Sequence, residues 1–259
     1  MIVDSHCHLD HFQGQEQDDV VARAKAAGVA TMVTIGTRLG EQAATVRAIA
    51  DRHDGVFATV GIHPHNAGER EAPTVEEILR EADHPKVIGI GESGLDYFYD
   101  KAPRPMQAES FRRHIAAARQ SGLPLVIHSR DADDDMAAIL EDEAGQGAFP
   151  FLLHCFSSGA DLARLAVRLG GYVSFSGMLT FPKSEAIRAI AAETPADRLL
   201  VETDSPYLAP VPFRGKRCEP AYVVHTAAKL AEVRGLGIAA LAELTTGNFH
   251  RLFTRARAG

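Results

Sequence analysis

The sequence predicts an α/β protein built as a single (β/α)8 TIM barrel, and three observations lead to that prediction. The chain has 259 residues, close to the roughly 250 residues typical of such a barrel. Short apolar segments rich in β-branched residues recur along the whole chain, as expected of buried strands. Amphipathic segments with helical spacing lie between them, and this alternation predicts parallel strands joined by crossover helices. We expect one domain, spanning residues 1–259.

Turn residues bound each predicted strand. The predicted strands are Ile2–Asp4, Ala30–Ile35, Val56–Gly61, Val87–Gly91, Leu125–Ile127, Phe151–Leu153, Gly171–Phe175 and Leu199–Glu202. Thr74 and Glu77 have the spacing of a helical capping box. Gly28, Gly122 and Gly170 stand where helices should end before the next strand. An open doubly wound sheet has similar local signals and is the alternative, but no GxGxxG motif supports it.

Composition and charge exclude several classes of protein. Hydrophobic residues make up 46% and charged residues 24%, as in ordinary globular proteins. No apolar run approaches the roughly 20 residues of a membrane span, and the N-terminus lacks signal-peptide features, so we expect a cytoplasmic protein without a membrane partner. Three cysteines without CxxC spacing predict neither disulfides nor a thiolate zinc site. A net charge of −7 argues against general attraction to nucleic acid, so a nuclease would need locally concentrated basic groups.

Side chains that can bind metal collect at the ends of the predicted strands. They are His6, His8, Glu92, His128, His154 and Asp204. In a barrel the carboxyl ends of all strands open onto one face, where barrel active sites are built. His6 and His8 are two residues apart in an extended segment, so their side chains point the same way and can bind one ion. A lone strand-end histidine is more often structural, but a set of this size predicts a metal site.

Two divalent ions fit this set better than one, because a single tetrahedral ion needs only three or four protein ligands. Glu92 is the natural bridge. One ion would bind His6, His8, Glu92 and Asp204, and the second would bind Glu92, His128 and His154. With a bound hydroxide such a site carries a charge of about +1, which would attract a phosphodiester. The ions would activate a bridging water and Asp204 would accept its proton, so Asp204 and Glu92 are the predicted catalytic residues.

Six ordered motifs resemble those of the TatD-like metal-dependent DNases, in the amidohydrolase superfamily, over essentially the full length. The motifs are Asp4–Asp10, Gly61–His65, Gly91–Tyr97, Ile127–Arg130, His154–Ser157 and Glu202–Pro206. The resemblance implies a barrel, the six ligands named above and metal-dependent hydrolysis of DNA, often from the 3′ end. It also implies auxiliary substrate-binding roles for His63 and His65, with loop histidines held beside Pro64 as the alternative.

Further substrate-binding candidates come from the same resemblance. Asp96 and Arg130 match motif positions and are candidates for supporting the residues that bind metal or substrate, with a loop ion pair as the alternative for either. The segment 210–220 resembles the family's RGKRNEP segment, although Cys218, a weak thiol donor, replaces the usual asparagine. Arg214 and Lys216 are candidates for phosphate contacts, with solvated surface charge as the alternative. The implied partner is DNA with single-stranded or frayed 3′ ends, and the expected protein is a monomer or weak oligomer.

Metal identity and reaction type have open alternatives. A mixed nitrogen and oxygen shell suits Zn²⁺, Mn²⁺, Co²⁺, Ni²⁺ or Fe²⁺ better than Mg²⁺, whereas the family is commonly described as magnesium-dependent. An amide or ester hydrolase, such as an aminoacyl-tRNA deacylase, is the leading alternative enzyme. Related barrels often bridge their ions with a modified lysine, and the motif around Glu92 has none, which favours a phosphodiesterase. A non-catalytic metal-binding scaffold is the third possibility, which the complete ligand set disfavours.

Overall fold

The computed structural model describes residues 1–257 and contains eight parallel strands, ordered in space as they are in the chain. The strands are β1 (Ile2–Cys7), β2 (Val29–Thr34), β3 (Val56–Val60), β4 (Val87–Asp96), β5 (Leu125–Arg130), β6 (Phe151–Leu153), β7 (Tyr172–Phe175) and β8 (Leu199–Val201). A parallel bridge between Cys7 and Ser205, with a hydrogen bond from Asp204 N to His6 O of 2.9 Å, brings the chain beyond β8 against β1. The predicted TIM barrel is therefore confirmed.

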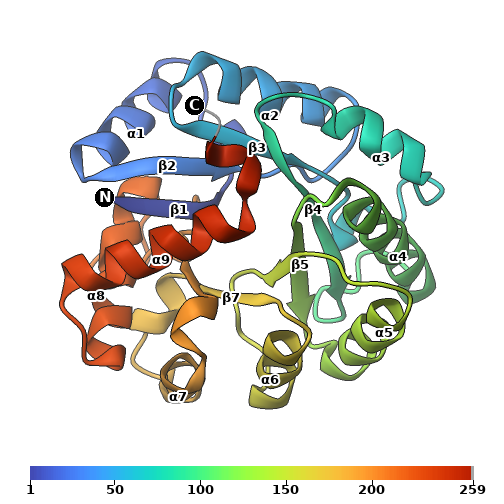
Figure 1. Ribbon diagram of the computed structural model, residues 1–259. Coiled ribbons are helices and arrows are strands. Elements are labelled where there is room, and N and C mark those ends of the chain that lie inside the picture. Colours follow the sequence, from blue (N-terminus) through green and yellow to red (C-terminus); the bar gives the residue numbers. More distant parts are fainter. Residues whose placement is uncertain (258–259) are drawn as a thin grey trace.

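Helices surround the strands, as Figure 1 shows. They are α1 (Gln15–Ala26), α2 (Glu41–Arg52), α3 (Val75–Ala82), α4 (Arg104–Ser121), α5 (Asp133–Gly145), α6 (Ala160–Arg168), α7 (Glu185–Glu193), α8 (Val223–Arg234) and α9 (Ile238–Leu252). The predicted capping box is present, since Thr74 and Glu77 exchange side-chain to backbone hydrogen bonds at the start of α3. Gly122 ends α4 in the left-handed conformation with φ of 70°, as its position predicted. Within the described part of the chain, no helix is both long and apolar enough to cross a membrane.

The apolar core has two parts, because strand side chains alternate between the helices and the barrel interior. One cluster lies between strands and surrounding helices, and includes Val87 and Ile90 of β4. The other joins residues of seven strands to the end of the chain. Its members are Val3, Val33, Ile35, Ile88, Val126, Leu152, Tyr172, Leu200, Phe249, Leu252, Phe253 and Ala256. Helix α9 crosses one end of the barrel in Figure 1 and closes it with Phe249. We call this cluster the floor.

Three strands are longer than the sequence predicted. β1 continues past Asp4 to Cys7, β4 past Gly91 to Asp96, and β5 past Ile127 to Arg130. The extensions are paired, with Cys7 opposite Thr34 and Asp96 opposite Arg130. The predicted ends were wrong because these strands continue through the polar residues that follow their apolar segments. Consequently His6, Glu92 and His128 lie within their strands rather than after them.

Candidate metal centre

Glu92 of β4 lies at the middle of the predicted ligand set, at the end of the barrel opposite the floor. Its side chain is 2% exposed. Glu92 Oε2 lies 3.4 Å from His6 Nε2, whereas Oε1 lies 2.9 Å from His128 Nδ1 and 2.8 Å from His154 Nε2. The two oxygens of one carboxylate thus face histidines from different sides of the barrel. This is the arrangement required of a residue that bridges two cations.

The group facing Glu92 Oε2 comes from β1 and from the chain that follows β8. The Nε2 atoms of His6 and His8 are 3.4 Å apart. Asp204 Oδ1 lies 3.5 Å from the first and 3.4 Å from the second. Asp204 adopts a left-handed backbone with φ of 59°, a conformation that aspartate tolerates better than most residues. The backbone hydrogen bond to His6 ties this turn to β1, so the three side chains are brought together.

The group facing Glu92 Oε1 contains one more histidine than the predicted ligand set. His128 Nδ1 and His154 Nε2 are 3.3 Å apart, and His63 Nε2 lies 3.3 Å from Glu92 Oε1. Gly61, two residues earlier, allows this approach, because a Cβ atom there would lie 2.5 Å from Gly91 Cα. The sequence suggested an auxiliary role for His63. The structure places it in direct contact with the central carboxylate.

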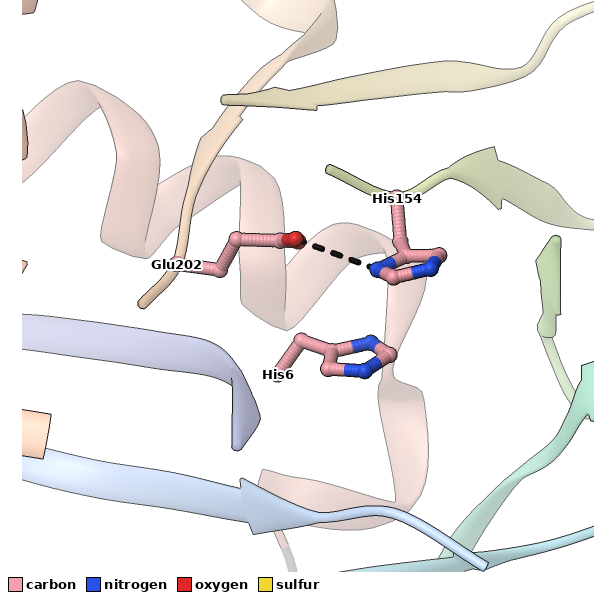
Figure 2. Close-up of side chains that lie close together, drawn as sticks. All are labelled: His6, His154 and Glu202. Atoms are coloured by element: carbon pink, nitrogen blue, oxygen red, sulfur yellow. Dashed lines mark hydrogen bonds and ion pairs between the residues drawn. The ribbon is translucent and has the colours of Figure 1, made fainter. Parts of the chain in front are cut away.

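Two buried carboxylates lie behind the histidines. Glu202 Oε1 is 3.2 Å from His154 Nδ1 and also accepts a 2.7 Å hydrogen bond from Cys155 N. Figure 2 shows this carboxylate directed at His154. The ring of His6 is stacked on that of His154, with centroids 3.9 Å apart. A carboxylate on the far nitrogen of a histidine is the usual partner of a metal-bound imidazole. Sequence reasoning did not select Glu202, although it precedes Asp204 by two residues, the same spacing as His6 and His8.

Asp96 is the second of these carboxylates. Its Oδ2 lies 3.0 Å from His128 Nε2 and 2.8 Å from His65 Nε2. The side chain is completely buried, so it is placed to orient the two rings rather than to touch a substrate. Asp96 and Arg130 are register partners in the sheet, but the Asp96 carboxylate is used by the histidines. The Asp96 carboxylate is therefore held by two histidines and not by an arginine or a lysine of the described residues.

The electrostatics of the cluster separate ionised carboxylates from neutral and charged rings. Burial alone would raise the pKa of Glu92, but the surrounding imidazoles, His154 foremost, hold it well below its ordinary value. The pKa of Asp204 is lowered in the same way, again against the effect of burial. Burial would lower the pKa of His154, but the carboxylates of Glu92 and Glu202 raise it well above its ordinary value. Burial lowers the pKa of His63 to about 4. Carboxylates therefore stay ionised in this buried place.

The donor set fits a divalent cation, as its hydrogen bonding shows. Both nitrogens of His128 face carboxylate oxygens, yet a neutral imidazole carries only one N–H. The Nε2 atoms of His6 and His8 face each other, and the Nδ1 atoms of both rings, which are buried, have no hydrogen-bond partner. Cations among these nitrogen and oxygen atoms would balance the carboxylates and satisfy the lone pairs. The residues therefore fit a metal centre.

Comparison with known proteins identifies the family. The family model described as "TatD related DNase" matches residues 3–254. This chain belongs to that family. It is 39% identical over 256 residues to the uncharacterized metal-dependent hydrolase YabD of Bacillus subtilis, covering 98% of this chain and 99% of that protein. It is 36% identical over 246 residues to the 3′-5′ ssDNA/RNA exonuclease TatD of Enterobacter lignolyticus, covering 92% and 93%.

Solved structures of the TatD family agree with the fold described above. The crystal structure of YjjV, a TatD homolog from Escherichia coli K12, superimposes with a TM-score of 0.88 at 28% identity and covers 98% of both chains. As a member of the TatD family, the chain is a metal-dependent hydrolase.

Of the remaining predicted substrate-binding residues of this TatD-family chain, Arg130 is the last residue of β5, and Arg214 and Lys216 lie between β8 and α8. The guanidinium of Arg130 lies over the rings of Phe98 and Tyr99, with its Cζ atom 4.1 and 4.8 Å from their centroids. Arg214 Cζ lies 4.4 Å from the centroid of Phe181, and Lys216 is exposed nearby in the chain. Cys218 is fully buried. Arg130, Arg214 and Lys216 remain candidates for phosphate contacts, since none of them makes an ion pair with another described residue.

Proposed function

We propose that this protein is a deoxyribonuclease that hydrolyses phosphodiester bonds of single-stranded DNA from the 3′ end, with two divalent ions in the centre described above. The observation that carries the proposal is Glu92, whose two oxygens face two separate groups of ligands. The name of the Enterobacter relative, a 3′-5′ ssDNA/RNA exonuclease, supports the choice of substrate. The absence of a lysine from the motif around Glu92 supports a phosphodiester over an amide.

In this proposal each ligand has a defined place. His6, His8, Glu92 and Asp204 would hold one ion, and Glu92, His128 and His154 would hold the other. Bound there, the ions supply Lewis acidity and a water whose pKa lies near neutrality. The chain's own residues do the rest. Asp204, whose side chain is 15% exposed, is the most accessible carboxylate of the set and receives the proton of the attacking water. Glu202 and Asp96 keep His154 and His128 in orientation.

A product-length assay tests the proposed function. The purified protein is first analysed for bound metal and then incubated with 5′-labelled single-stranded DNA in the presence of Mn²⁺, Zn²⁺ or Mg²⁺. We expect a ladder of products shortened one nucleotide at a time from the 3′ end, and its loss on chelation. An ester and amide panel that includes an aminoacyl-tRNA is run in parallel. Turnover confined to that panel would replace the nuclease assignment with a deacylase or amidase.

Asp204→Asn tests the assignment of the base in the same assay. General-base catalysis is typically worth about 10²–10⁴ in rate, so the variant should lose at least a hundredfold in kcat while it keeps its fold. Circular dichroism and metal analysis accompany the assay, to show that the variant is folded and loaded. A loaded Asp204→Asn protein with the kcat of the unmodified enzyme would remove Asp204 from the mechanism.

A further inference from the structure

Exposed aromatic side chains occur in one region of the molecule. Among the phenylalanines and tyrosines of residues 1–257, only Phe98, Tyr99 and Tyr207 are exposed, at 55%, 50% and 51%. Phe98 and Tyr99 follow β4 directly, and Tyr207 lies in the loop after β8. The carboxyl ends of both strands open at the face that holds the candidate metal centre. Exposing three aromatic rings to water beside a catalytic site costs free energy unless a ligand covers them.

The rings belong to opposite sides of that face. In a barrel of eight sequential strands, β4 and β8 lie across from each other. The ring of Tyr99 contacts His65 edge-on at 5.2 Å, and His65 binds the Asp96 carboxylate that orients His128. The ring of Tyr207 lies edge-on to His8, at 6.2 Å between centroids. Tyr207 thus lies directly against one predicted ligand, His8. Tyr99 is connected to another, His128, through His65 and Asp96. The metal centre therefore lies between Tyr99 on the β4 side and Tyr207 on the β8 side of the barrel opening.

Unpaired cations accompany the rings on the β4 side. Arg130 lies over both Phe98 and Tyr99, and Lys101 Nζ lies 5.5 Å from the centroid of Tyr99. Neither cation makes an ion pair with any residue that the structure describes, whereas Arg23, Arg38 and most other arginines do. Because the chain has a net charge of −7, cationic side chains without ion pairs beside exposed rings indicate what kind of ligand would bind there. They match a ligand that combines flat bases with phosphates.

We propose that Tyr99, together with Phe98, and Tyr207 form two base-stacking subsites on opposite rims of the candidate metal centre, with single-stranded DNA lying across the barrel mouth. This inference rests on the proposed function, the cleavage of a phosphodiester bond in DNA. The unstacked bases of the strand pack on the rings, and Arg130 and Lys101 meet the phosphate next to the base on Tyr99. In a double helix the bases stack on each other and are not available to the rings. The subsites therefore select unpaired DNA.

Ring removal and ring retention separate stacking from other roles. Tyr99→Leu and Tyr207→Leu remove the ring, Tyr99→Phe and Tyr207→Phe keep it, and Ile238→Ala is the control. Ile238 is 48% exposed and begins α9, at the floor end of the barrel. Kinetics are measured on a single-stranded oligonucleotide and on the same strand with abasic residues at its 3′ end. Base stacking on an aromatic ring is worth enough that each leucine variant should raise KM roughly tenfold.

The expected pattern is specific to stacking. The leucine variants should raise KM rather than lower kcat, and the phenylalanine variants should restore a low KM. The unmodified enzyme should already have a high KM on the abasic strand, and the leucine variants should not raise it further. Ile238→Ala should behave as the unmodified enzyme does. A leucine variant with an unchanged KM on the base-bearing strand would overturn the proposal, as would an equal rise on the abasic strand.

A binding measurement keeps this inference distinct from the proposed function. Fluorescence anisotropy with a phosphorothioate strand, which resists cleavage, reports binding to the metal-loaded protein independently of turnover. If the protein cleaves no phosphodiester but binds this strand through its rings, the nuclease assignment fails and the subsites stand. If it cleaves DNA and the leucine variants bind as tightly as the unmodified protein, the subsites fail and the nuclease assignment stands.

Discussion

The two ends of the barrel are built from the same strands but hold opposite chemistry. At the floor, Val3 of β1 packs in an apolar cluster with Phe249 and Phe253, which are fully buried and stacked at 4.7 Å. The opposite end, which holds the candidate metal centre, is here called the mouth. There His6 of the same strand is equally buried but lies among imidazoles and carboxylates. Burial of apolar surface stabilises the fold, whereas burial of charge costs free energy unless it is compensated. The floor therefore stabilises the folded protein, whereas the buried charged groups of the mouth lower its stability and serve its function.

Asp4 illustrates the cost at the mouth. It is completely buried, and burial raises its pKa to about 8 even though the carboxylate accepts hydrogen bonds from Thr203 N and Thr203 Oγ1 at 2.9 and 2.6 Å. These bonds hold the segment that leads to Asp204. Asp4 takes no part in the proposed reaction. Its burial thus costs free energy because Asp4 positions Asp204, which does take part. At the floor no comparable group is needed.

The largest expected effect comes from removing the charge at the centre of the mouth. Glu92→Gln keeps the size of the side chain but removes the carboxylate that faces both ligand groups. We expect kcat to fall by at least about 10⁴, equivalent to more than about 5 kcal/mol, because binding of both ions is affected. Turnover is measured at saturating Mn²⁺.

The thermal stability of the same variant provides its control. Binding to the folded state raises the melting temperature, so Mn²⁺ should stabilise the unmodified protein and have much less effect on Glu92→Gln. Without metal, the variant should be less stable than the unmodified protein, because the imidazole of His154 loses a carboxylate that compensates its charge. An inactive variant that Mn²⁺ stabilises as strongly as the unmodified protein would show that Glu92 is not a shared ligand.

The floor should respond in the opposite way. Phe249→Ala removes a fully buried ring that packs against Phe253, so we expect the free energy of unfolding to fall by about 4 kcal/mol. Phe249→Leu retains most of the volume and should cost about half as much. Urea unfolding measures both changes. The kcat of the folded fraction should be unchanged, and a selective loss of kcat would mean that the two ends of the barrel are coupled.

This division explains what the sequence could predict. The strands can be predicted from the sequence because their residues facing the floor or the helices are apolar. Glu92 and Asp204 can be predicted as site residues because they interrupt or follow that apolar pattern. The role of Glu202 was not readable, because a carboxylate that orients His154 looks the same in sequence as one that binds metal. The contact of His63 with Glu92 also depends on the path of the loop after β3, which periodicity does not describe.

A third prediction concerns a histidine behind the mouth. His114 of α4 is completely buried, its Nε2 accepts a hydrogen bond from Ile62 N, and its Nδ1 lies 2.7 Å from Ser110 O. These contacts suit a neutral ring, and burial lowers its pKa from 6.5 to about 4. In the unfolded chain the ring binds a proton below pH 6.5, whereas in the folded protein it does so only near pH 4. Its contribution to stability is thus complete above pH 6.5 and is lost as the pH falls towards 4.

Substitution isolates this contribution from other titrating groups. Over that range the shift corresponds to at most roughly 3 kcal/mol. The free energy of unfolding is measured by urea at pH 7 and at pH 4.5, for the unmodified protein and for His114→Gln. The loss of stability between the two pH values should be smaller in the variant. Equal losses in both proteins would mean that His114 does not titrate differently in the folded and unfolded states.

The smallest expected effect tests whether the mouth is functional as a whole or only at its centre. Thr74 is exposed at the start of α3, on the mouth side, where its Oγ1 accepts a hydrogen bond from Glu77 N at 3.2 Å. Thr74→Ala should lower the free energy of unfolding by about 1 kcal/mol, and Thr74→Ser should recover most of it. Neither kcat nor KM should change, because the cap stabilises a helix and touches none of the ligands. A changed KM would extend the functional surface beyond the metal centre and the aromatic rims, and would place α3 within it.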